Sequence, residues 1–140
     1  MNHTVRRALA TGAAAAAIAA AGGLTTASAS TQYSPDTFHI CVDQSCTMET
    51  NGTITWTNRM ASISGEVINR VSGTAMADFG VFAGENSIDG MVVKSASYTT
   101  TKFPATAVGD PNLVGGVNIV KIKICSSYTR CSAEHSYYRN

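Results

Sequence analysis

The stretch that decides the fold reads VNIVKIKIC and spans residues 117–125. Its larger aliphatic side chains alternate with lysines, and a period of two residues places successive side chains on opposite faces of a β-strand. One face is apolar and the other is charged: Val120, Ile122 and Ile124 against Lys121 and Lys123. The strand is therefore expected to cover a core on one side, with its lysines on an exposed face or at an edge of a sheet.

The same rhythm recurs in three segments toward the N-terminus. It is strict over residues 53–57, TITWT, and continues over residues 61–71 and 75–83, with interruptions near Gly65 or Asn69. No run of ten or more residues beyond the N-terminal segment shows the 3.6-residue period of a helix. Shorter segments supply further strand candidates: residues 38–42, 91–98, 99–107 and 135–139.

Seven or eight short strands at this spacing predict an all-β fold, a single antiparallel β-sandwich of the immunoglobulin-like kind. A closed barrel is the alternative architecture. We expect the core at the inward positions of the alternating segments: Ile54, Trp56, Ile63, Val67, Phe79, Val81, Val120, Ile122 and Ile124.

Glycine, asparagine and proline mark the expected ends of the strands. Asn51-Gly52 is the strongest hairpin signal, because both residues tolerate a positive φ, and we place a turn there. With the threonine that follows, this pair also matches the N-glycosylation pattern, although the turn is a sufficient explanation. We expect turn chemistry over residues 84–90 and a loop over residues 109–116. Pro104 has no amide hydrogen, so its strand should lie at an edge or contain a bulge.

The N-terminal segment has the order of features of a secretory signal peptide. Arg6-Arg7 are followed by an uncharged, alanine-rich run over residues 8–21 and then by Ala27-Ser28-Ala29, the small-x-small pattern that signal peptidases cleave. The run is too short and too weakly apolar to span a bilayer. The paired arginines leave both the general secretory route and the twin-arginine route open.

Three regions follow from this interpretation. We expect a signal peptide over residues 1–29, a flexible leader over residues 30–36 and the β-sandwich domain over residues 37–140. The mature protein is expected to be secreted, with no membrane attachment after cleavage. Its 111 residues carry eight basic and nine acidic side chains, and the cations are dispersed. A partner nucleic acid is therefore not expected.

Four cysteines lie in the expected mature chain. An even number in an exported protein predicts two disulfides, and we favour Cys41–Cys46 and Cys125–Cys131 because each pair closes a short loop. Pairing between the first and last strands remains an alternative. The C-x4-C and C-x5-C spacings differ from those of common zinc knuckles, so we expect no metal site.

Chemistry-bearing residues form no recognisable catalytic pattern. His39 and His135 could meet if the terminal strands paired, with Asp43 or Glu134 as further ligands, but we expect both histidines on the surface. No G-x-S-x-G motif is present. Acidic residues that could form a glycosidase-like pair are expected to be solvated charges: Glu66, Asp78, Glu85 and Asp89. We therefore expect no catalytic residues and no cofactor.

Tyrosines give the one candidate binding surface. Tyr128, Tyr137 and Tyr138, together with Tyr98, could gather near the final hairpin, and exposed tyrosines are good anchors for sugars or proteins. Adjacent strand residues point to opposite faces, so at most one of Tyr137 and Tyr138 is exposed if the other lies in the core.

Several stretches resemble small secreted proteins of high-GC Gram-positive bacteria. They are GTITWTNR over residues 52–59, FAG over residues 82–84 and residues 109–125. These proteins have no assigned activity, so the resemblance implies an extracellular β protein and supplies no site. A more distant likeness, in size, compartment and disulfide style only, is to the neocarzinostatin-type apoproteins, which are secreted sandwiches with a cleft for an apolar chromophore.

The sequence as a whole favours a non-catalytic extracellular binding or interaction module. Its expected partner is a protein, a carbohydrate or a small apolar molecule. The alternatives are a small extracellular hydrolase, which would need converging carboxylates or histidines in a concavity, and a structural protein of the cell surface.

Overall fold

The computed structural model describes residues 33–127 and 129–140. The expected signal peptide lies outside the described residues. Within them the chain forms nine strands and no helix, so no helix there is long and apolar enough to cross a membrane. The strands are β1 (Asp36–Cys41), β2 (Met48–Trp56), β3 (Ala61–Asn69), β4 (Ala75–Ala83), β5 (Asn86–Ser95), β6 (Thr100–Val108), β7 (Ile119–Ser126), β8 (Arg130–Cys131) and β9 (His135–Tyr138).

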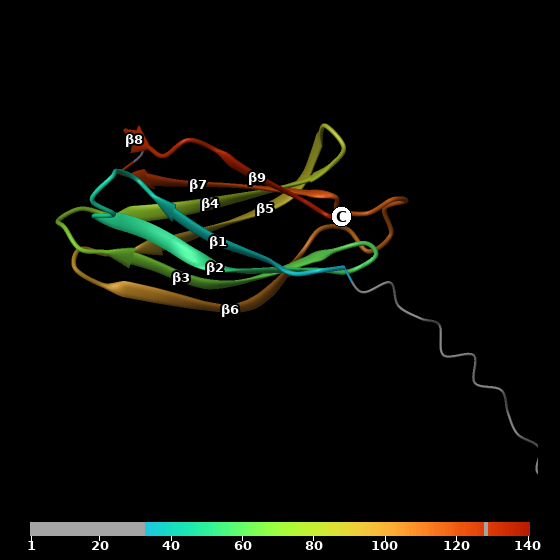
Figure 1. The fold of residues 1–140 in the computed structure, drawn as a ribbon, viewed down its shortest axis with the longest axis horizontal. Coiled ribbons are helices and arrows are strands. Elements are labelled where there is room, and N and C mark those ends of the chain that lie inside the picture. The colour runs from blue at the N-terminus through green and yellow to red at the C-terminus, as the bar shows by residue number, and fades with distance from the viewer. Residues whose placement is uncertain (1–32, 128) are drawn as a thin grey trace, which may run out of the picture.

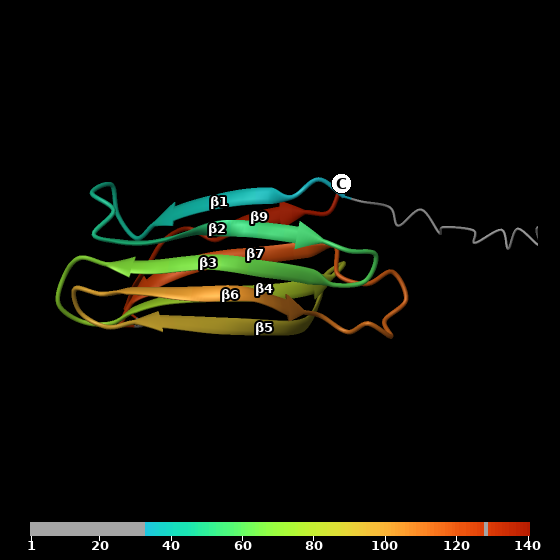
Figure 2. The ribbon, with the colours of Figure 1, turned by 90° about the horizontal axis from the view of Figure 1, so that it is seen from below.

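The strands form two antiparallel sheets that pack face to face, which confirms the predicted β-sandwich. Sheet A has the order β1-β2-β3-β6, and sheet B has the order β5-β4-β7-β8 with β9 also paired to β7. Figure 1 shows the two layers, and Figure 2 shows sheet A in front of β4, β5, β7 and β9. The meander β1-β2-β3 stays in one sheet, whereas the third strand of an immunoglobulin constant domain starts the second sheet. The protein therefore resembles immunoglobulin domains in its two-layer architecture and differs from them in how the strands are distributed between the sheets.

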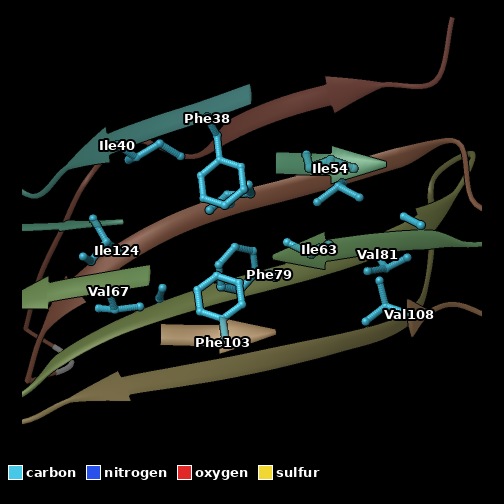
Figure 3. Packing of buried hydrophobic residues seen from close by; sticks show 14 of the residues in the cluster. Phe38, Ile40, Ile54, Ile63, Val67, Phe79, Val81, Phe103, Val108 and Ile124 are labelled. Carbon is cyan, nitrogen blue, oxygen red and sulfur yellow. The ribbon is translucent and has the colours of Figure 1, made fainter. Parts of the chain in front are cut away.

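The core lies between the sheets and contains all nine residues that the alternation predicts. Phe79 of β4 lies at its centre, with its ring edge-on to Phe38 of β1 at 5.8 Å and to Phe103 of β6 at 5.5 Å between centroids. Figure 3 shows the three rings together in the core, with Phe79 between Phe38 and Phe103. Phe79 therefore joins sheet B to both outer strands of sheet A.

The turn predicted at Asn51-Gly52 is wrong. Both residues lie in the middle of β2, which pairs with β1 on one side and β3 on the other. A Cβ atom on Gly52 would lie 2.0 Å from the carbonyl oxygen of Ser64 and 2.7 Å from Cζ of Phe38. Glycine is present because the neighbouring strand and ring approach closely, and the chain turns instead at residues 57–60.

The other predicted turns, loops and strand irregularities lie close to their observed positions. Within residues 84–90 the turn is limited to Gly84-Glu85, because β5 already starts at Asn86. Pro104 lies in β6, an edge strand of sheet A whose register with β3 shifts near this point, as predicted. Residues 109–116 form the loop before β7, also as predicted.

Both favoured disulfides are confirmed. Cys41–Cys46 closes the β1–β2 loop, and Cys125–Cys131 joins β7 to β8. Both lie at the end of the sandwich where β1 and β7 finish (Figure 1). At the other end, part of the expected leader contacts the domain, because Asp36 begins β1 and its Oδ2 accepts a hydrogen bond from Nε1 of Trp56 at 2.7 Å.

Candidate functional site

The outward side chains of sheet B form a grid that can be followed across three strands. Residues directly opposite each other in neighbouring strands share a face, so each row takes one residue from β5, one from β4 and one from β7. From the disulfide end, the rows are Lys94, Met76 and Cys125; Val92, Asp78 and Lys123; Gly90, Gly80 and Lys121; and Ser87, Phe82 and Ile119.

The third row is hollow because two of its three residues are glycines. A depression of about 440 Å³ lies over Gly80 and Gly90, within the size range of small-molecule sites. The backbone requires glycine at position 90, where a Cβ would lie 2.8 Å from the carbonyl oxygen of Phe79. A Cβ on Gly80 would meet the ring of Phe82 at 3.0 Å and no backbone atom closer than 3.9 Å. A glycine inside a strand often marks a bulge or the close approach of a ligand or another backbone, and the register between β4 and β5 shifts just after Gly80.

Two ion pairs and an aromatic ring border this depression. Nζ of Lys123 lies 3.5 Å from Oδ2 of Asp78, and Nζ of Lys121 lies 3.2 Å from Oε1 of Glu134. The Lys121 ammonium also lies 4.9 Å from the centroid of the Phe82 ring, a cation–π contact. The four charged side chains are partly exposed, so the border offers both signs of charge beside a floor of glycine backbone.

A second depression, of about 340 Å³, adjoins the first across the second row of the grid, whose residues line both. It lies over Met76 and is bordered by the Cys125–Cys131 disulfide. Val92, at the shared border, is 57% exposed although it is a large aliphatic residue. We call the two depressions together the sheet-B trough, defined by its first three rows and Phe82.

The four carboxylates considered for a hydrolase do not gather at one place, and Glu85 lies exposed in the β4–β5 turn. Glu66 lies in β3 of sheet A, whereas Asp78 and Asp89 line the trough. Asp78 is paired with a lysine, and Asp89 accepts hydrogen bonds of 2.8 Å from the backbone amides of Gly90 and Gly109. Both carboxylates of the trough therefore already have protein partners.

The two histidines lie in different sheets. His39 is in β1, which pairs with β2, and His135 is in β9, which pairs with β7. The terminal strands do not pair, so the condition for a two-histidine site is not met. The named acidic partners are engaged elsewhere, because Asp43 accepts hydrogen bonds from Thr47 and Glu134 pairs with a lysine.

His39 instead belongs to a cluster around a buried carboxylate, which the sequence did not indicate. Oε2 of Glu49 lies 2.7 Å from Nε2 of His39, and Oε1 of Glu49 accepts a hydrogen bond from Arg70. The Glu49 side chain is only 8% exposed. Burial by itself raises the pKa of this carboxyl, but the hydrogen bonds from His39 and Arg70 and their charges outweigh burial and hold the pKa below its ordinary value.

This cluster should make the stability of the protein sensitive to acid. A lowered pKa means that ionised Glu49 stabilises the fold above pH 4.5, the ordinary value, and that this contribution is lost as the pH falls through the folded-state pKa. We expect Arg70→Met to reduce the free energy of unfolding by about 1–2 kcal/mol at neutral pH. The difference from the wild type should narrow below pH 4.5 in urea titrations.

Arg130→Met is the matched control. Arg130 is 68% exposed and lies 3.9 Å from Asp43, so its loss should cost less than about 0.5 kcal/mol. Equal losses for the two variants, or an Arg70→Met loss independent of pH, would contradict the assignment.

The predicted tyrosine surface does not form a cluster among the described residues. Tyr128 lies outside them. Tyr137 faces the core, with its ring 6.4 Å from that of Phe38. Tyr138 is 56% exposed on the outer face of sheet B, and Tyr98 is 71% exposed in the β5–β6 loop at the opposite end of the sandwich.

Comparison with models of known protein families, with curated proteins and with solved structures finds no match. The sheet-B trough is therefore the feature from which the function is inferred.

Proposed function

We propose that this protein is a non-catalytic binding module that acts outside the cell and holds a small organic ligand in the sheet-B trough. The observation that carries the proposal is the depression over Gly80 and Gly90. It is bordered by Phe82, by Val92 and by two lysines, each of which forms an ion pair. A strand normally gains stability from branched and aromatic side chains, so two facing glycines at an outward position cost stability and make room.

The lining indicates the chemistry of the ligand. Val92 and the ring of Phe82 favour a flat apolar group over the glycines. The partly exposed ammonium groups of Lys121 and Lys123 and their carboxylate partners favour polar substituents at the edge of the ligand. The two disulfides support an oxidising, extracellular location.

A charge placed at the border of the two depressions should abolish most of this binding. We expect anilinonaphthalene sulfonate, a flat anionic dye, to bind saturably at about one molecule per chain, and Val92→Asp to weaken it about tenfold, which is 1.4 kcal/mol. The new carboxylate would repel the sulfonate and hold water over the floor of the trough. Fluorescence titration measures the affinity, and circular dichroism at the same temperature checks that the sheets are intact.

Val114→Asp is the matched control, because it makes the same chemical change at a residue that is 92% exposed in the loop before β7. The dye affinity of this variant should equal that of the wild type. If the two variants bind the dye equally well, the trough is not the binding site.

A further inference from the structure

The cluster around Glu49 also places four metal-ligating residues together. His39 and Cys41 are two residues apart on β1 and share a face, and Glu49 of β2 lies directly opposite Cys41. Cys41 Sγ is 3.7 Å from Nε2 of His39 and 3.9 Å from Oε2 of Glu49. The β1–β2 loop brings in Cys46, so that one ligand atom from each residue lies within 4.8 Å of the others.

We infer that this cluster becomes a zinc site when the Cys41–Cys46 disulfide is reduced. A dithiol or two molecules of a small thiol would supply the two electrons, giving two cysteine thiols and leaving the reductant as its own disulfide. Zn²⁺ then displaces one proton from each thiol and is held by two thiolate sulfurs, the imidazole of His39 and the carboxylate of Glu49. Two protons are released for each ion bound.

The donor set and its spacing suit zinc. Tetrahedral Zn²⁺ takes sulfur at 2.3 Å and nitrogen or oxygen near 2.0 Å, which sets its ligand atoms about 3.3–3.8 Å apart. Three of the four ligand atoms already have separations of 2.7–3.9 Å, and the Cys46 sulfur lies within 4.8 Å of the others, so shifts of about 1–2 Å would complete the site. A mixed set of sulfur, nitrogen and carboxylate oxygen favours Zn²⁺ over the softer Cu(I).

Arg70 completes the environment of the site. Its guanidinium binds the Oε1 atom of Glu49, which leaves Oε2 for the metal, and Nη1 donates a hydrogen bond of 2.7 Å to the carbonyl oxygen of Cys46. Two thiolates and one carboxylate carry three negative charges, which Zn²⁺ and this guanidinium balance. Arg70 therefore acts as a partner in the outer shell that orients both a ligand side chain and the ligand-bearing loop.

The disulfide of this site is open to exchange. Cys41 and Cys46 are both partly exposed, and because their loop is short, opening the bond should cost the fold little stability. Among the described residues, the Cys125–Cys131 disulfide belongs to no such group of ligands and serves as an internal reference.

Zinc titration of the protein before and after reduction with a phosphine tests the inference. We expect the reduced protein to bind one Zn²⁺ per chain and its melting temperature to rise with added zinc, because a folded-state site stabilises the fold whereas cysteines of an unfolded chain do not. The oxidised protein should show neither effect. Co²⁺ substitution should give thiolate-to-cobalt absorption.

Variants assign the ligands. His39→Asn, at a side chain 60% exposed, and Glu49→Gln should each weaken zinc binding about tenfold to 100-fold. Cys125→Ser/Cys131→Ser should leave it unchanged. If that variant fails to fold, Cys41→Ser/Cys46→Ser, which keeps only the reference pair, should lose binding. Absence of a zinc-dependent rise in melting temperature in reduced wild type, or equal binding by His39→Asn and wild type, would overturn the inference.

Discussion

Replacing Phe79 with alanine is expected to lower the free energy of unfolding by about 3–5 kcal/mol. Its ring is fully buried and makes edge-on contacts with Phe38 and Phe103. These contacts come from opposite edges of sheet A, so the substitution leaves a cavity where β1, β4 and β6 meet. A domain of this size is stable by about 5–15 kcal/mol, so the loss is a large share of the whole.

Urea unfolding followed by tryptophan fluorescence measures this loss, because Trp56 is buried in the same core. Phe82→Ala is the control. It removes the same ring two residues along the same strand, from the outer face of sheet B, where the side chain is only half-buried. We expect a loss of about 1 kcal/mol there. A loss for Phe79→Ala no larger than for Phe82→Ala would mean that the centre of the core lies elsewhere.

The alternation of apolar and polar side chains was enough to predict the fold, because it reports directly which face of each strand is buried. Val120, Ile122 and Ile124 are apolar at every second position since one face of β7 is fully covered. The same reasoning placed β3 and β4 correctly. Disulfide pairing followed from loop length alone, because each pair lies at the end of a strand where a short loop brings the sulfurs together.

Glycine was the ambiguous residue. Gly52 and Gly90 both follow a residue that favours turns, and both are found inside strands where a neighbouring backbone passes close by. A local pattern cannot distinguish a glycine needed for a positive φ from one needed for close approach, because the second requirement is imposed by a segment distant in sequence.

The candidate site depends on the same kind of distant information. Asp78 and Gly80 lie between the inward positions of β4, so alternation places them outward, but the trough exists only because Gly90 of β5 lies beside Gly80. Likewise His39 and Glu49 are ten residues apart, and only the register between β1 and β2 brings the imidazole to the carboxylate. The predicted turn at Asn51-Gly52 lies inside β2, so the sequence interpretation did not pair residues 49–52 with β1.

Gly52→Ala separates the two interpretations of that glycine. In the strand, the added methyl group would lie 2.0 Å from the carbonyl oxygen of Ser64, a backbone atom that cannot move without separating β2 from β3. Forcing this separation should cost about 3 kcal/mol or more. In a two-residue turn, the same change would cost only the strain of a positive φ, about 1 kcal/mol.

Gly84→Ala supplies the reference value within the same protein. Gly84 has a φ of +62° in the β4–β5 turn, and an added Cβ would meet nothing within 4 Å. Its replacement should therefore cost about 1 kcal/mol, the strain alone.

Because β2 lies between β1 and β3, separating it from β3 also displaces the Phe38 ring that packs on Gly52 and contacts Phe79. Gly52→Ala should thus weaken the near-ultraviolet circular dichroism of the aromatic rings, whereas Gly84→Ala should not. Equal stability losses for the two variants would indicate that Gly52 lies in a turn. The β1–β2 register, on which the Glu49 cluster depends, would then be wrong.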